Sequence, residues 1–176
     1  MQTDTAQTMQ QTQAPAPERP AKPCSASATE TTRILQYRDI NGENRLFGGK
    51  LMEWIDEAAT ITAMRHCECH VTTACVDTLV FKKGAYLNDL VVVAARVTYV
   101  GTTSMEVRVD SYVEDSATGL RHMINHAYLT VVCVDEDGKP KQIPYDLKIE
   151  GEEEQIEYEG AMRRREMRRE RREEGY

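Results

Sequence analysis

One amphipathic helix followed only by strand-like segments is the feature that most constrains the fold of this chain. Residues 48–66 carry apolar side chains at helical spacing, which predicts a long helix with one apolar face. These side chains are Leu51, Ile55, Ala58 and Thr62, with Trp54 and Ile61 beside them. A first strand is predicted at residues 31–40, and four segments with period two follow the helix at residues 71–81, 90–100, 103–114 and 120–134.

The segments after the helix predict an antiparallel sheet with one covered face. In residues 105–114 the apolar side chains occupy odd positions, so we expect the polar even positions to face water. One strand, a long helix and four more strands make an α+β domain of the hotdog type, in which an antiparallel sheet wraps around one long central helix. Because one helix cannot cover every edge of such a sheet, we expect at least a dimer.

The two ends of the chain differ from its centre in composition. Residues 1–30 are rich in Gln, Thr, Ala, Ser and Pro, which predicts a disordered leader before a domain at residues 31–150. Residues 151–176 alternate Glu and Arg at helical spacing, which predicts a solvated charged tail, either a frayed helix or a coil. The alternative for this tail is that its arginines contact an RNA or the anionic end of a ligand.

Charge and hydropathy exclude several classes of protein. The formal net charge of -7 disfavours a nucleic-acid partner, because phosphate neutralisation needs a basic surface. No segment approaches the roughly 18 consecutive apolar residues of a membrane span, and the first residues lack the layout of a signal peptide. We therefore expect a cytoplasmic protein without a membrane partner, whose five irregularly spaced cysteines are reduced thiols.

The run of His, Cys, Glu, Cys and His at residues 66–70 raises the question of a metal site. Zinc sites usually combine two nearby cysteines with a second ligand pair elsewhere in the chain. Apart from this run, the chain's histidines are His122 and His126, and no second pair is evident. We therefore expect no metal here, and interpret the run as a polar helix end with two reduced thiols.

Four segments form a pattern that is more specific than any one of them. They contain, in order, Asn41 and the Phe-Gly-Gly of residues 47–49 followed by an aspartate in the helix, then residues 71–81, the Val-Gly-x-x-Ser that begins at Val100, and residues 137–144. This series resembles the cytosolic acyl-CoA hydrolase group of hotdog-fold acyl-CoA thioesterases over residues 33–147. The resemblance implies hydrolysis of fatty acyl-CoA to free fatty acid and coenzyme A. It also implies a dimer as the active unit, usually three dimers in a hexamer, and no cofactor, because coenzyme A is part of substrate and product.

This chain departs from the family pattern in two loops. Asn44 stands where the family usually has a glycine, and Gly42 and Glu43 replace a pair that is commonly histidine. Asparagine tolerates a left-handed backbone better than other non-glycine residues, so we expect the turn to survive with shifted geometry. Residues 82–84 and Asn88 replace a proline and a glycine that often follow the Phe81 position.

Thioester hydrolysis needs a base or nucleophile and donors for the developing oxyanion. Gly48 and Gly49 open the predicted helix, where free backbone N–H groups and the helix dipole favour a negative oxygen. The resemblance assigns Asp56 to activating water or attacking the carbonyl, and its apolar neighbours in sequence predict partial burial. It assigns Asn41 to holding that water or polarising the thioester, and implies that Asn41 of one subunit meets Asp56 of the other.

Coenzyme A carries phosphates, so an acidic protein needs local basic residues to bind it. The expected substrate-binding residues are Arg65, Lys82 and Lys83 for the phosphates, and Thr73, Gly101, Thr102 and Ser104 along the rest of the molecule. For each basic residue, solvated surface charge is the alternative interpretation.

Two other functions are compatible with a hotdog domain. A non-catalytic acyl-CoA-binding or sensing module would keep the pocket without turnover, although the presence of both Asn41 and Asp56 disfavours it. A dehydratase or hydratase would need a histidine and a carboxylate acting together, and the Asp-x-Asn-Pro-x-His motif of such hydratases is absent.

Overall fold

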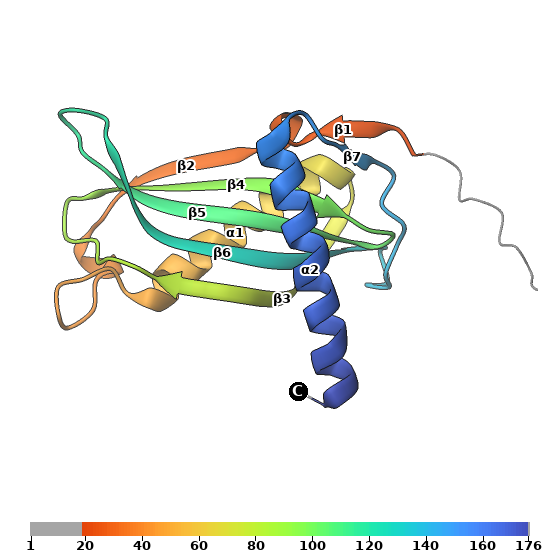
Figure 1. Cartoon of the computed structure of the whole chain (residues 1–176). Helices are drawn as coiled ribbons and strands as arrows, with labels where there is room; N and C mark the ends of the chain where they lie inside the picture. The colour runs from red at the N-terminus through yellow and green to blue at the C-terminus, as the bar shows by residue number, and fades with distance from the viewer. Residues whose placement is uncertain (1–18, 176) are drawn as a thin grey trace, which may run out of the picture.

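A five-stranded antiparallel sheet carries a helix on each face in the computed structural model, which describes residues 19–175 (Figure 1). The strand order is β2-β4-β5-β6-β3. The strands are β2 Thr29–Ile34, β3 His70–Phe81, β4 Leu90–Val100, β5 Ser104–Glu114 and β6 Arg121–Val134. Helix α1, Gly48–Cys67, lies behind the sheet in this view, and helix α2, Glu152–Glu174, crosses in front of it. The predicted α+β hotdog fold is confirmed.

Four short elements complete the described chain. Strands β1, Ala21–Pro23, and β7, Asp146–Lys148, form a separate parallel pair. The 3-10 turns η1, Cys24–Ala26, and η2, Tyr37–Asp39, flank β2. Neither long helix of residues 19–175 is apolar enough over its length to cross a membrane.

Helix α1 forms where the apolar spacing predicted it and buries that stripe against the sheet, except that Ile61 beside it is exposed. Leu51, Ile55, Ala58 and Ala63 are buried in one core with the inward-facing valines of β4 and β5. The helix ends because Glu68 adopts a left-handed backbone, with φ 54°, and returns its N–H to a carbonyl of the last turn. The helix therefore sets the position of everything attached to either of its ends.

The strand predictions are confirmed after the helix and wrong before it. Strand β4 matches its predicted limits, and β3, β5 and β6 each begin within one residue of theirs. The first strand, expected at residues 31–40, covers Thr29–Ile34 instead and gives way to η2. The cause is Asp39, whose carboxylate accepts the N–H of Gln36 at 3.0 Å while its carbonyl accepts the N–H of Phe47 at 2.8 Å. These bonds turn the chain from the sheet edge into α1.

The expected disordered leader and the domain start at residue 31 are wrong for residues 19–30. Arg19 donates to the carbonyls of Gly101 at 2.8 Å and Ile143 at 3.1 Å, and pairs with the carboxylate of Asp146 at 3.2 Å. The next residues then form β1 alongside β7. The polar composition of this segment did not predict its ordered structure, because that order depends on distant backbone partners rather than on apolar side chains of its own. The part of the leader at residues 1–18 lies outside the described residues.

Part of the second face of the sheet is covered by a helix, which the sequence pattern did not predict. Glu106 and Asp110 occupy even positions of β5, expected to face water, yet their exposed fractions are 1% and 9%. Helix α2 lies across this face (Figure 1). The predicted alternation of strand β5 is therefore correct for its inner face and wrong for its outer one.

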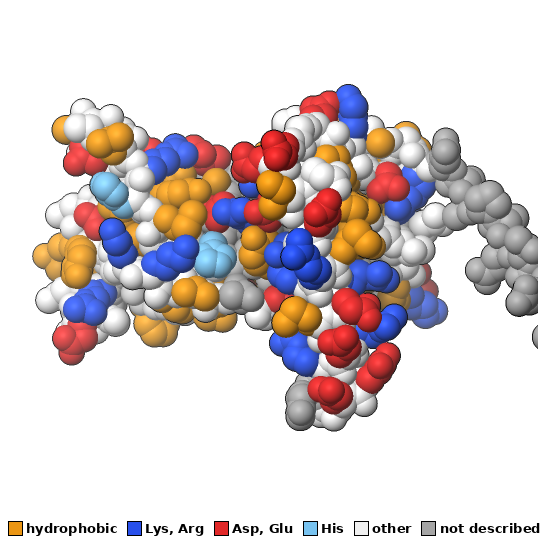
Figure 2. All heavy atoms as spheres, viewed as in Figure 1, with side chains coloured by type: hydrophobic (Ala, Val, Ile, Leu, Met, Phe, Trp, Pro, Cys, Tyr) orange, Lys and Arg blue, Asp and Glu red, His pale blue; other side chains and the backbone are white. Residues whose placement is uncertain are grey.

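Helix α2 is held on the sheet by charged groups, so the expectation of a solvated tail is wrong. The Arg164 guanidinium donates to both carboxylate oxygens of Glu106, at 2.7 and 3.1 Å, and lies 3.6 Å from the centre of the Tyr128 ring. Arg168 is buried and pairs with Asp77 of β3. Charged side chains cover the exposed side of the helix, as Figure 2 shows, while these two arginines face inward. Whether the outer arginines contact an RNA or a ligand stays a prediction.

Replacing Arg164 with alanine should destabilise the fold by about 3 kcal/mol, because it leaves the buried carboxylate of Glu106 without its bidentate partner. The matched control is Arg163→Ala, one residue away on the exposed side of α2, expected to change stability by less than about 0.5 kcal/mol. Urea unfolding of both variants measures the difference. Equal stability of the two variants would contradict this role for α2.

Candidate active site

The first turn of α1 presents two unpaired backbone donors. The N–H groups of Lys50 and Leu51 bond to the Phe47 carbonyl at 2.9 and 3.1 Å, whereas those of Gly48 and Gly49 have no acceptor in residues 19–175. A Cβ atom at Gly49 would lie 2.6 Å from the Phe47 ring, so the ring rests directly on this glycine. The turn therefore offers donors and the positive end of a 20-residue helix to an anionic oxygen.

Asn41 organises the loop that leads into this turn. Its Oδ1 accepts the backbone N–H groups of Glu43 at 3.0 Å and Arg45 at 3.2 Å. Asn44 adopts a left-handed backbone with φ 56°, the conformation that asparagine tolerates better than other non-glycine residues. With its oxygen used by the loop, the exposed Asn41 side chain keeps its amide N–H groups available to a ligand.

Asp56 lies on α1 against strand β3. The Thr73 hydroxyl donates to Asp56 Oδ1 at 2.6 Å and fixes the carboxylate at the seam between helix and edge strand. The apolar neighbours Ile55, Ala58 and Ala59 are buried against the sheet, while Asp56 is exposed. The expected partial burial is therefore absent within one chain, because residues adjacent in sequence lie on different sides of a helix.

One chain keeps the proposed reacting groups apart. Asp56 follows Gly49 by seven residues, which is about 10 Å of rise along α1. Asn41 precedes the helix, at the same end as the glycines. The Asp56 carboxylate and the glycine N–H groups of a single chain therefore cannot both contact one thioester group.

The expected coenzyme A residues lie at opposite ends of the sheet. Lys82 and Lys83 follow β3, near the start of β4, whereas residues 101–104 form the turn after β4, whose eleven residues span about 36 Å. Arg65 is at the C-terminal end of α1 and donates to Thr29 Oγ1 at 3.1 Å. The structure does not bring these residues together within one chain.

Strand β3 is the sheet's edge on the side of Asp56 and Thr73. It comes last in the strand order, and its side chains Val76, Val80 and Phe81 are exposed, the last by 53%. In Figure 1, α2 continues past this edge, so its C-terminal part has no sheet of its own chain beneath it. An unpaired edge with exposed apolar side chains is the geometry of a surface that pairs with another chain.

Comparison with known proteins defines the class. Residues 43–120 match the family model of the thioesterase superfamily. An acyl-CoA thioester hydrolase of Bacillus subtilis, YkhA, is 41% identical over 119 residues, which cover 68% of this chain and 69% of the relative. An acyl-CoA hydrolase from Staphylococcus aureus, solved with butyryl coenzyme A and coenzyme A, superimposes with a TM-score of 0.83 at 38% identity, covering 88% of this chain and 94% of that one. A hexameric acyl-CoA thioesterase gives 0.82 at 39% identity, covering 86% and 97%.

The chain belongs to the acyl-CoA thioester hydrolases of the thioesterase superfamily, and it is a thioester hydrolase. The resemblance read from the sequence is therefore confirmed at the level of family, fold and enzyme class. The contact between Asp56 and Thr73 was not foreseen, since Thr73 was expected only to bind substrate. The two residues are seventeen positions apart, and no local pattern connects them.

Proposed function

We propose that this enzyme hydrolyses fatty acyl-CoA to free fatty acid and coenzyme A without a cofactor, with Asp56 activating the water or attacking the carbonyl itself. The observation that carries the assignment is the 2.6 Å bond from Thr73 that holds the Asp56 carboxylate in a fixed position. In the water-activating form, water oxygen attacks the thioester carbon as its proton passes to Asp56. The carbonyl becomes an oxyanion; when it re-forms the carbonyl, the carbon–sulfur bond breaks, and the departing thiolate takes the proton from Asp56 to leave as coenzyme A thiol.

The solved Staphylococcus aureus structures support these assignments. They include alanine variants of an asparagine, an aspartate and a threonine. In that chain the asparagine precedes the aspartate by fifteen residues, and the aspartate precedes the threonine by seventeen. The same two spacings separate Asn41 from Asp56 and Asp56 from Thr73 in this chain. The three side chains that the sequence and the fold single out in this chain therefore have counterparts at the same intervals.

We propose that the complete site forms between two copies paired along β3. Antiparallel pairing of two β3 edges would set the helix start of one copy beside the middle of α1 in the other, which supplies Gly48, Gly49 and Asn41 from one chain and Asp56 from its partner. It would also give the overhanging end of α2 a sheet to cover, and bury the exposed apolar side chains of β3. Three such dimers would make a hexamer, and two similar solved thioesterases are hexameric.

The same pairing supports coenzyme A binding by residues from both ends of the sheet. It would place Lys82 and Lys83 of one chain nearer to Arg65 and the turn of residues 101–104 in the other, so that basic groups and backbone donors converge on one ligand. The acidic net charge elsewhere favours coenzyme A, a small anion held by a few basic residues, over nucleic acid. We place this activity in the cytoplasm, as the sequence predicted.

The non-catalytic alternative, an acyl-CoA-binding or sensing module, makes a different prediction in one assay. Release of free thiol from acyl-CoA esters, measured from acetyl to palmitoyl chain lengths, separates turnover from binding. Binding without thiol release at every length would favour the sensing module.

Asp56→Ala should reduce turnover at least about 100-fold with little change in KM, because the carboxylate serves the chemical step. The matched control is Glu53→Ala, another exposed carboxylate on α1, which should keep turnover within about twofold. Thiol release by both variants provides the measurement. Turnover by Asp56→Ala within about tenfold of the parent would remove Asp56 from the mechanism.

Thr73→Val should lower turnover about tenfold, because one hydrogen bond that orients the carboxylate is lost and the fold is kept. Thr73→Ser retains the hydroxyl and should recover most of the activity. Steady-state rates with the same acyl-CoA distinguish the two. If serine and valine behave alike, the bond to Asp56 does not position the carboxylate.

Val80→Asp should produce a smaller assembly with little turnover, because a charge on the β3 edge opposes pairing and each site needs two copies. Leu120→Asp, which changes an exposed apolar residue on the hairpin between β5 and β6, should leave size and activity unchanged. Analytical ultracentrifugation and thiol release measure both effects. An active Val80→Asp variant of unchanged size would argue against assembly through β3.

A further inference from the structure

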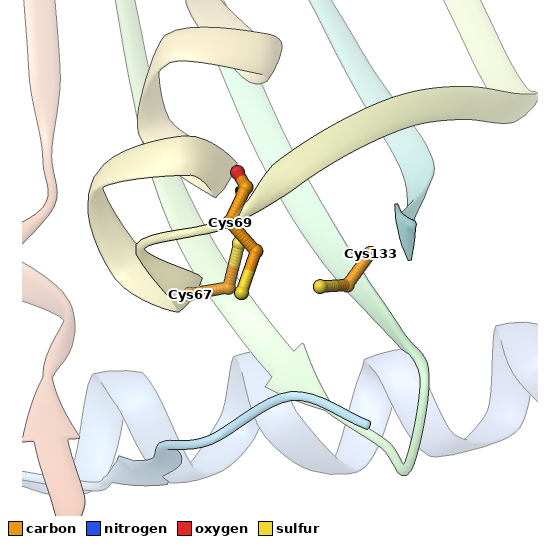
Figure 3. Close-up of side chains that lie close together, drawn as sticks. All are labelled: Cys67, Cys69 and Cys133. Carbon is orange, nitrogen blue, oxygen red and sulfur yellow. Dashed lines mark hydrogen bonds between the residues drawn. The ribbon is translucent and has the colours of Figure 1, made fainter. Parts of the chain in front are cut away.

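Three thiols from separate segments meet at the end of the sheet where α1 finishes. The Sγ atoms of Cys67, Cys69 and Cys133 all lie within 4.8 Å of one another (Figure 3). Cys67 is the last residue of α1, Cys69 precedes β3, and Cys133 is near the end of β6. The strand register explains part of this proximity, because Cys133 of β6 is paired with Val71 of β3, and Cys69 lies two residues before Val71, just ahead of the strand.

The fold thus supplies a ligand that the sequence pattern did not reveal. The expectation of no metal at residues 66–70 rested on the lack of a further ligand pair, for which His122 and His126 were the candidates. His126 lies seven residues from Cys133 along β6, roughly 23 Å away, and His122 lies farther along the same strand. Cys133 supplies the third candidate ligand, because neither histidine is close enough to do so.

The spacing of the three sulfur atoms suits a tetrahedral thiolate site. Zinc–sulfur bonds of about 2.3 Å place the sulfur atoms of a tetrahedral site roughly 3.8 Å apart. An upper limit of 4.8 Å between the atoms therefore requires contraction of about 1 Å at most. Helix α1 and strand β6 hold the Cα atoms of Cys67 and Cys133 in place. Rotation of the cysteine side chains would supply the remaining contraction between the sulfur atoms.

The surroundings favour a cation over three free thiolates. Burial raises the pKa of Cys67, and burial together with the neighbouring thiols raises the pKa of Cys133 to about 12. The Cys67 and Cys133 thiols are therefore protonated in the absence of a positive charge at the cluster. The negative end of the α1 dipole adjoins Cys67 and also favours a bound cation.

An ion can reach this cluster from one side. Cys67 and Cys133 are fully buried, whereas Cys69 is partly exposed and lines a surface hollow of about 730 Å³. Asp135 and Asp137 also line that hollow. A metal held by the three sulfur atoms would thus have its fourth position open towards water on the Cys69 side.

We propose that Cys67, Cys69 and Cys133 bind one thiophilic metal ion of the Zn²⁺ class, which ties the end of α1 to β3 and β6. Zinc and cadmium both take thiolate ligands in this geometry, and binding would release the thiol protons to solvent. The site is structural, because Asp56 lies eleven residues earlier on α1, about 16 Å away.

The test uses the full-length protein, reduced and stripped with a chelator, then dialysed against Zn²⁺ or Cd²⁺ without air. We expect one ion per chain by elemental mass spectrometry and an ultraviolet thiolate-to-cadmium absorption band. We also expect a thermal midpoint several degrees above that of the stripped protein, and thiol release from acyl-CoA within about twofold. If the reduced protein takes up no ion, the proposal is overturned. Formation of a disulfide between two of these thiols in air would not rescue it.

Matched cysteine variants locate the ion. Cys69→Ser and Cys133→Ser should each weaken binding at least tenfold and abolish the absorption band, while Cys75→Ser, on β3 outside the cluster, should bind as the parent does. If Cys133→Ser fails to fold because the residue is buried, Cys69→Ser still decides the question, since that side chain is partly exposed. Full uptake by Cys69→Ser would place the ion elsewhere, for instance on the carboxylates of the hollow, and overturn the assignment.

Discussion

The burial of one helical stripe against one face of an antiparallel sheet is the constraint on which the rest of this structure depends. Leu51, Ile55 and Ala58 of α1 pack on the valines of β4 and β5, and this contact fixes both the direction and the ends of the helix. At its start, two glycine N–H groups have no acceptor among the described residues; near its middle, Asp56 is held beside β3; at its end, Cys67 lies close to Cys133. Three separate chemical features therefore follow from one apolar contact.

The opposite face of the sheet is covered by different means. Helix α2 has few apolar residues, and it binds through arginines that reach buried carboxylates on β5 and β3. Buried ion pairs of this kind add little net stability compared with apolar packing, but they fix geometry, because removing one partner leaves a charge without compensation. An outer layer built from charges keeps α2 in one register across the strands, and its far end then projects beyond β3.

The projecting end of α2 and the exposed β3 edge both favour pairing with a second copy, on which the proposed active site depends. A single chain separates its glycine N–H groups from the Asp56 carboxylate along α1, so the proposed mechanism would need a second copy to bring these groups together. With the proposed shared site, assembly and activity would be coupled, since each site would form and be lost with the interface. The family membership is consistent with this arrangement, because solved relatives of this class include hexamers.

The elements that can be predicted from the sequence are those with short-range periodicity. Helix α1 and the strands from β3 to β6 can be predicted because apolar residues recur with the period of one helix face or one strand face. The family pattern around Asn41, Gly49 and Asp56 can be recognised because it depends on local spacing. The tertiary structure decided what depends on contacts between distant segments. The ordering of Arg19 on Gly101, the burial of Glu106 beneath Arg164 and the bond from Thr73 to Asp56 each join residues far apart in the chain. Such contacts leave no periodic trace, because a polar side chain looks the same in sequence whether water or a distant partner satisfies it.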